Sequence, residues 1–339
     1  MIGFVIPAAL AFILIALVLA AMIAPAETMT WWAGWADRET EETEPEVEAR
    51  EQSTPARAYI VYLAGVNVIS GDALTNGEKR FLKCLRKRAP GCIIVDDIFP
   101  YSPSGRALIG NTRFFEKLWR FIERTSLKRR RRLADLVNLR NIFQVLVAAD
   151  PRYGPIFNFG AADLIRDGLD RVGYPKDSKS TVIIIGYSGG IQIAAGAAGY
   201  LSRLLRAPIS IISIGGLFTS TPGIESLASF HHLRGGSDKS VRLGAVIFPM
   251  RWKIFARSHW NRLRRAGRVF FHDLPGMSHL GPKGYFGPLR RESNETNFNR
   301  TLACVATIIE RDLNRPEDRP VDGALQEAGD PSDIKSSSQ

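Results

Sequence analysis

The chain has 339 residues, 45% of them hydrophobic, and its 45 Lys and Arg residues outnumber its 34 Asp and Glu residues to give a net charge of +11. The three cysteines form no C-x-x-C pair, which argues against a metal site or a disulfide framework. A single Cys84–Cys92 disulfide remains an alternative if the domain lies in an oxidising compartment. The basic balance suits an anionic partner, but no nucleic-acid-binding motif is present, so no nucleic-acid partner is expected.

The amino-terminal segment Met1–Ala26 contains no charged side chain. About 20 apolar residues suffice to span a bilayer, and Trp31, Trp32 and Trp35 follow as an interfacial aromatic belt would. The alternative is a signal peptide, which has a basic start and a shorter apolar core, whereas no Lys or Arg precedes Arg38. We therefore predict a single-pass membrane anchor. Too few basic residues flank it to decide on which side of the membrane the rest of the chain lies.

Polar, low-complexity segments flank the central part of the chain. Residues 27–51 hold nine acidic and two basic residues, and the carboxyl-terminal tail is polar and ends in Ser-Ser-Ser-Gln. Such composition cannot bury a core. We predict an acidic disordered tether over 27–57 and a disordered tail over 314–339. The intervening residues 58–313 fit one domain of typical size.

Apolar, β-branched segments alternate with helical ones throughout this domain. That alternation predicts an α/β fold with a mainly parallel sheet and helices on both faces. The expected strands are 58–65, 92–97, 181–186, 209–214, 227–233 and 268–272. The expected helices are 76–88, 157–172, 190–205, 241–265 and 298–313.

One connection is much longer than the others and is basic. Residues 99–150 form a helical excursion, and Arg113–Arg140 within it carries ten basic and three acidic residues, including the run Lys128–Arg132. Phe114, Phe115, Leu118, Trp119 and Ile122 recur at helical spacing beside these cations. A basic amphipathic helix of this kind binds anionic membranes, although its apolar side can equally pack on the domain. We expect a helical insertion with Lys128–Arg132 as a second membrane contact.

The segment Thr181–Gly190 reads as a buried strand that runs directly into Gly186-Tyr-Ser188-Gly-Gly190 and then into a helix rich in small residues. This is the G-x-S-x-G pattern in a strand–turn–helix context. The turn is sharp, so a Cβ at Gly186 or Gly190 would clash with its surroundings. Ser188 would then project its hydroxyl from the carboxyl edge of the sheet, at the start of a helix. The pattern predicts a serine nucleophile, with a glycine-rich turn and an incidental serine as the alternative.

A nucleophilic serine needs a base and an orienting carboxylate. Two later strands end in loops that carry them, Gly235-Gly-Ser-Asp238 and Leu274-Pro-Gly-Met-Ser-His279. His272 is the main rival to His279 because it ends the same strand. Asp273 is the nearest rival to Asp238, and Asp150 is another, but it precedes the serine.

Residues 59–313 resemble an α/β-hydrolase in the broad lipase and esterase sense, through the Ser188 turn, the Asp238 loop and the His279 loop in that order. The resemblance implies that Ser188 is the nucleophile, His279 the general base and then acid, and Asp238 the residue that orients it. It also implies that the helical insertion at 99–150 forms a cap. No metal or organic cofactor is implied.

An oxyanion hole requires two preorganised hydrogen-bond donors. In the family, one is the backbone N–H of the residue after the nucleophile, here Gly189. The other comes from the loop after the first core strand, where Gly65 permits close approach and Val66, or secondly Asn67, is the donor. The His-Gly dipeptide common in lipases is absent, because Ala64 stands in place of the histidine.

These features predict a membrane-anchored serine hydrolase that cleaves a carboxylic ester or thioester, with lipid-derived esters among the candidates. The alternative is a membrane-tethered, non-catalytic binding or scaffolding module of the same fold. The missing His-Gly dipeptide and the basic insertion favour that alternative, whereas the ordered Ser, Asp and His set disfavours it.

Overall fold

The computed structural model describes residues 56–67, 74–101, 127–175, 180–290 and 295–314, with side chains from residue 138 onward in the third of these ranges. The expected anchor Met1–Ala26, nearly all of the tether and of the tail, and the side chains of Lys128–Arg132 lie outside it. Within the described ranges, no helix has both the length and the apolar character that crossing a bilayer requires.

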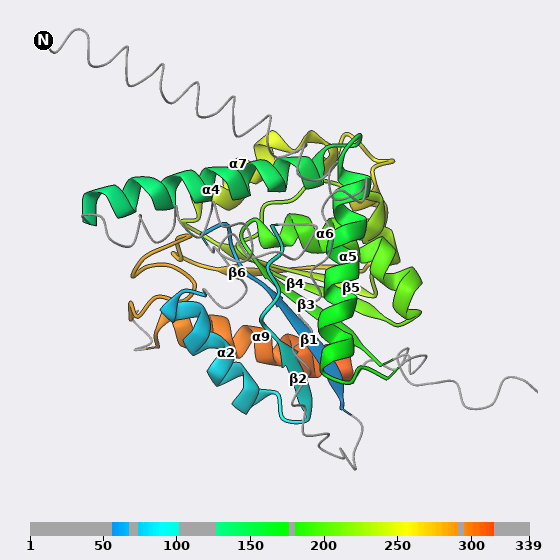
Figure 1. Cartoon of the computed structure of the whole chain (residues 1–339), viewed down its shortest axis with the longest axis horizontal. Helices are drawn as coiled ribbons and strands as arrows, with labels where there is room; N and C mark the ends of the chain where they lie inside the picture. Colours follow the sequence, from blue (N-terminus) through cyan, green and yellow to red (C-terminus); the bar gives the residue numbers. More distant parts are fainter. Residues whose placement is uncertain (1–55, 68–73, 102–126, 176–179, 291–294, 315–339) are drawn as a thin grey trace, which may run out of the picture.

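The described strands form one six-stranded sheet in which every neighbouring pair is parallel (Figure 1). Its order is β2-β1-β3-β4-β5-β6. The strands are β1 (Ala58–Leu63), β2 (Cys92–Val95), β3 (Val182–Tyr187), β4 (Ile209–Ile214), β5 (Ser229–Gly235) and β6 (Val269–Leu274). The three strands β1, β3 and β4 are buried along their whole length, as continuous apolar runs in a parallel sheet should be.

Helices cover both faces of the sheet (Figure 1). Helix α2 (Asn76–Arg88) packs against α9 (Asn297–Leu313), whereas α5 (Gly154–Arg171) packs against α6 (Gly190–Leu205). Right-handed crossovers that leave β1 and β3 in opposite directions along the sheet place α2 and α6 on opposite faces. Helix α4 (Leu127–Ala149), from the long basic connection, packs against α5 and α6. The expected parallel α/β architecture is confirmed.

The expected helix 241–265 is wrong as a single element. The structure has α7 (Lys239–Ile247), a short 3₁₀ turn η2 (Pro249–Arg251) and α8 (His259–Arg265). Pro249 has no N–H to donate and drives the preceding residue out of the helical region, so α7 ends at Ile247 and Phe248 has φ −107° and ψ 81°. A new helix starts only where the side chain of Ser258 accepts the N–H of Asn261.

The strand order fixes where a site can form. The chain passes from β1 outward to β2, then returns to the other side of β1 with β3 and continues through β4, β5 and β6. The connections after β1 and β3 therefore diverge, and they leave a crevice at the carboxyl ends of these two strands. Ser188 follows β3 directly and Val66 follows β1, so both lie at this point of the sheet.

Gly190 is expected to tolerate no side chain. A Cβ there would lie 2.6 Å from the carbonyl oxygens of both Leu63 and Ala64, which belong to a buried strand end. Gly190→Ala should cost about 1–3 kcal/mol in the free energy of unfolding, measured by urea denaturation. Gly244→Ala is the matched control, because the nearest atom to its Cβ would be Leu217 Cγ at 3.4 Å, an ordinary van der Waals distance. That change should be neutral or stabilise α7 by about 0.5–1 kcal/mol, and equal losses in the two variants would contradict this packing.

Candidate active site

Ser188 lies in the tight turn between β3 and α6 and adopts a left-handed backbone conformation, with φ 52°. A non-glycine residue reaches this region at a cost of roughly 1–2 kcal/mol. The turn is closed by its glycines: a Cβ on Gly186 would lie 2.5 Å from Ile191 Cδ1, and one on Gly190 would strike the end of β1. The crowding expected at both glycines is confirmed. The turn lifts Ser188 out of the sheet, and 8% of its surface stays accessible.

Three side chains from three loops form one hydrogen-bonded chain. Ser188 Oγ lies 2.9 Å from His279 Nε2, and His279 Nδ1 lies 2.9 Å from Asp238 Oδ2. The loops follow β3, β5 and β6, whose carboxyl ends share one edge of the parallel sheet. An ionised Asp238 can only accept, so His279 Nδ1 carries the proton and Nε2 is left to accept from the Ser188 hydroxyl.

The carboxylate of Asp238 is fully buried and every described contact stabilises its charge. Oδ1 accepts the N–H groups of Ser240 and Val241 at 2.8 and 3.1 Å, so it also caps α7. Oδ2 accepts the hydroxyl of Tyr285 at 2.8 Å besides His279. Burial acts to raise the pKa of Asp238, but His279, Tyr285 and the Val241 N–H outweigh it and lower the pKa below its ordinary value. Asp238 is therefore ionised at neutral pH.

Two tyrosines support this arrangement, and neither was predicted from the sequence. The Tyr285 hydroxyl accepts the Gly235 N–H at 2.7 Å while it donates to Asp238, so it ties the end of β5 to the carboxylate. The Tyr187 ring stacks on the His279 imidazole with centroids 5.4 Å apart, and its hydroxyl donates to the His279 carbonyl at 2.7 Å. The imidazole is thus held from its face as well as by its hydrogen bonds.

The loop after β1 lies against the serine turn. A Cβ on Gly65 would be 3.5 Å from Ser188 Cβ, and one on Gly189 would be 2.8 Å from Val66 Cγ1. Among the described residues, neither the Gly189 N–H nor the Val66 N–H has a hydrogen-bond acceptor. Asn67, the second candidate donor, is exposed and is the last residue of the first described range. Two available donors therefore lie next to Ser188.

Side chains from the long connection hold this loop in place. The Tyr101 hydroxyl donates to the Ala64 carbonyl and Asn141 Nδ2 donates to the Val66 carbonyl, both at 2.7 Å. Asn141 is fully buried on α4, and Val145 of the same helix contacts Gly189 closely enough that a Cβ there would lie 2.9 Å from Val145 Cγ2. The carboxyl-terminal half of α4 therefore packs over the serine turn. Sequence reasoning had no local signal for Asn141, because its partner is 75 positions away.

The rival residues lie elsewhere. His272 Nε2 contacts His231 Nδ1 at 3.1 Å in a buried cluster with Asp312. Asp273 pairs with Arg234, and Asp150 pairs with Arg152, which lowers the pKa of Asp150 to about 2. None of the three contacts Ser188. No group of His, Cys, Asp and Glu within the described residues is arranged to hold a metal ion.

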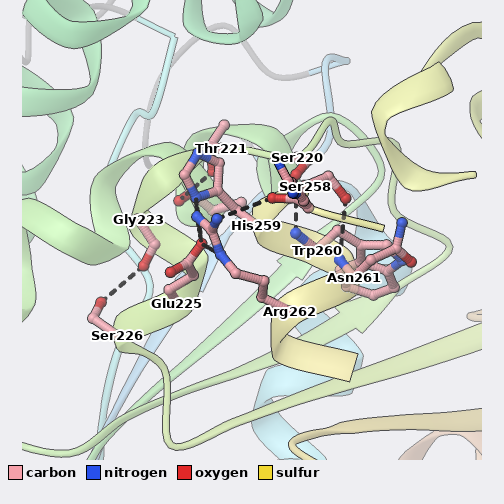
Figure 2. A network of polar contacts seen from close by, with 12 residues as sticks. Ser220, Thr221, Gly223, Glu225, Ser226, Ser258, His259, Trp260, Asn261 and Arg262 are labelled. Atoms are coloured by element: carbon pink, nitrogen blue, oxygen red, sulfur yellow. Dashed lines mark hydrogen bonds and ion pairs between the residues drawn. The ribbon is translucent and has the colours of Figure 1, made fainter. Parts of the chain in front are cut away.

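A separate cavity of about 430 Å³ lies between the end of α4, α5, α6 and the 3₁₀ turn η1 (Pro222–Ser226). Its wall contains none of Ser188, Asp238 and His279. Glu225 on that wall accepts hydrogen bonds from Arg262 Nε at 2.7 Å and from His259, as Figure 2 shows. Burial acts to raise the pKa of Glu225, but these two partners lower it. Two residues of α8 thus bind the Glu225 carboxylate, which links η1 to that helix.

No protein-family model matches the chain, and a search of curated proteins found no match. Assignment of a function therefore depends on the geometry of this site.

Backbone strain at Ser188 can be measured without any assay of activity. Ser188→Gly and Ser188→Ala both remove the hydroxyl, but only glycine adopts φ 52° freely. The Gly variant should be more stable than the Ala variant by about 1 kcal/mol in denaturant titrations. Arg206 has φ 51° at the end of α6 and serves as a control outside the site. Arg206→Gly should likewise be more stable than Arg206→Ala. A Gly variant at 188 that is less stable than the Ala variant would contradict the strained turn.

Proposed function

We propose that the chain is a serine hydrolase of the α/β-hydrolase type that cleaves a carboxylic ester or thioester, with lipid-derived acyl esters among the candidate substrates. The observation that carries the proposal is the hydrogen-bonded chain Ser188–His279–Asp238. Its support is chemical: a serine hydroxyl becomes a useful nucleophile only when a base accepts its proton and a carboxylate orients that base. The strand order, with the serine after β3, the acid after β5 and the histidine after β6, agrees with this fold type.

Attack on the acyl carbon is the first step. As Ser188 Oγ bonds to the carbonyl carbon, its proton passes to His279 Nε2 across the 2.9 Å contact. The imidazole becomes positively charged next to the buried, ionised Asp238, which stabilises that charge and keeps Nδ1 as the donor. The stacked Tyr187 ring keeps the imidazole plane from turning away.

The carbonyl oxygen becomes an oxyanion in the tetrahedral intermediate. The Gly189 and Val66 N–H groups are the proposed donors, since both lie next to Ser188 and have no acceptor among the described residues. Tyr101 and Asn141 anchor the flanking carbonyls of Ala64 and Val66, so the loop is preorganised and need not rearrange during the reaction. Loss of one such donor typically costs about 3–4 kcal/mol of transition-state stabilisation.

Collapse of the intermediate expels the alcohol or thiol, which takes the proton from His279 Nε2, and leaves Ser188 acylated. His279 Nε2 then takes a proton from water as the water oxygen attacks the acyl carbon. The bond from the acyl carbon to Ser188 Oγ breaks, Oγ receives that proton from His279, and the acid is released. Lipid-derived esters are among the candidate substrates because the charge-free segment Met1–Ala26 is proposed as a membrane anchor, with Lys128–Arg132 as a second lipid contact.

Hydrolysis of short p-nitrophenyl esters by the full chain in detergent tests the proposal. Ser188→Ala and His279→Ala should each lower kcat by roughly 10⁴–10⁶-fold, because the loss of one member of a catalytic triad removes most of the rate enhancement of the whole triad. Ser226→Ala, an exposed hydroxyl on η1, is the matched control and should keep full activity. Unchanged hydrolysis by Ser188→Ala would rule out this nucleophile. A wild-type chain without activity on oxygen esters and thioesters would favour the non-catalytic binding module.

A further inference from the structure

Helix α7 turns a stripe of apolar side chains toward solvent. Leu243, Val246 and Ile247 share one helical face, and Val246 is 64% exposed. Only Val241 and Gly244 of this helix are buried. An amphipathic helix at the surface of a globular domain normally buries its apolar stripe. Helix α7 instead exposes these apolar side chains to solvent.

The apolar stripe continues beyond the helix. Met250, Trp252, Ile254 and Phe255 are all exposed, and Ile254 is 81% exposed. Together with Leu243, Val246 and Ile247 they form what we call the α7 face. Patches of this kind on a folded protein mark interaction sites more often than chance exposure.

The α7 face is rigidly built. Trp252 Nε1 donates to the Ala245 carbonyl of α7 at 2.7 Å. Asn261 Nδ2 donates to the carbonyls of Trp252 and Phe255 at 2.7 and 3.0 Å. Figure 2 shows Asn261 at the start of α8, where Ser258 caps the helix and the Trp260 N–H donates to Ser220 Oγ. The exposed side chains are therefore presented by a segment whose backbone is hydrogen-bonded to the domain.

The segment that carries the α7 face is strongly basic. Residues 239–268 contain nine Lys and Arg residues and no Asp or Glu. Some of these cations are engaged: Arg251 packs over the Phe218 ring at 3.8 Å, and Arg262 binds Glu225. Lys239, Lys253, Arg257 and Arg265 are exposed and, among the described residues, form no ion pair. These four are the cations available to an external anion.

We propose that the α7 face docks on an anionic lipid surface. Its exposed apolar side chains would enter the acyl boundary, and the four free cations would contact the head groups. This combination of apolar anchors and basic residues is the chemistry of interfacial membrane binding. Each basic residue near an anionic surface favours binding by roughly fivefold, so four together favour it by several hundredfold.

Docking in this way would bring the candidate active site to the bilayer. Asp238 caps α7, so the helix begins at the carboxyl edge of the sheet, the edge that also bears Ser188. Figure 1 shows α7 at the end of the domain toward which the strands run. Leu280, next to His279, is exposed as well. The proposal concerns binding and does not depend on hydrolysis.

A local probe on the full chain tests the proposal, because the amino-terminal segment could attach the protein to vesicles by itself. A genetically encoded, environment-sensitive fluorescent amino acid replaces Ile254 in one protein. In a control protein it replaces Leu204, an exposed apolar residue at the carboxyl-terminal end of α6, the end away from Ser188. Each protein is mixed with phosphatidylcholine vesicles with or without phosphatidylglycerol. At position 254 we expect a blue shift and quenching by a nitroxide-labelled lipid in anionic vesicles only, and no change at 204.

Charge reversal tests whether the exposed cations bring the probe at position 254 to the lipid. Replacing Lys239, Lys253, Arg257 and Arg265 by Glu should keep the 254 probe in water, whereas the same change at Lys79, Lys83 and Lys87 on α2 should not. Both sets should keep the circular dichroism spectrum of the wild type, which shows that the variants still fold. A probe already shielded without lipid would mean that residues 102–126 or a second copy cover the face, and the proposal would fail. Equal burial in neutral vesicles, or insensitivity to charge reversal, would overturn it too.

Discussion

The buried carboxylate of Asp238 joins the parts of the molecule on which the account depends. Its Oδ1 caps α7 and its Oδ2 accepts from His279 and from Tyr285, which in turn binds the end of β5. A buried charge persists only when its hydrogen-bonding capacity is filled, and here backbone, hydroxyl and imidazole donors fill it. One ionised group thereby fixes the orientation of the imidazole and the starting point of the helix that bears the exposed apolar face.

Much of this architecture could be predicted from the sequence because its causes are local or periodic. Buried apolar runs separated by helical segments indicated the parallel sheet, and parallel strands necessarily collect their following loops at one edge. The Ser188 turn could be predicted because it leaves no room for a Cβ at Gly186 or Gly190, a local steric requirement that the structure confirms. The single helix expected over 241–265 is wrong because Pro249 cannot continue a helix and ends α7.

The supporting residues could not be found in the same way, because their roles arise from contacts between distant segments. Tyr285 meets a carboxylate 47 positions away, and Asn141 meets the loop after β1 from a helix in the long connection. The sequence placed Asp238 and His279 in suitable loops, but it could not exclude His272, which lies in a different buried cluster. The outward apolar stripe of α7 was equally hidden, since periodicity shows that a helix has an apolar face and not where it points.

The proposed hydrolase requires Ser188 to be an activated nucleophile. The most direct test is to treat the purified full chain with a fluorophosphonate and to locate the adduct by peptide mass spectrometry. We expect one stoichiometric adduct on Ser188 in the wild type and none after His279→Ala, because the hydroxyl would then lack its base. An adduct on another serine, undiminished labelling after His279→Ala, or no adduct in the wild type would contradict it.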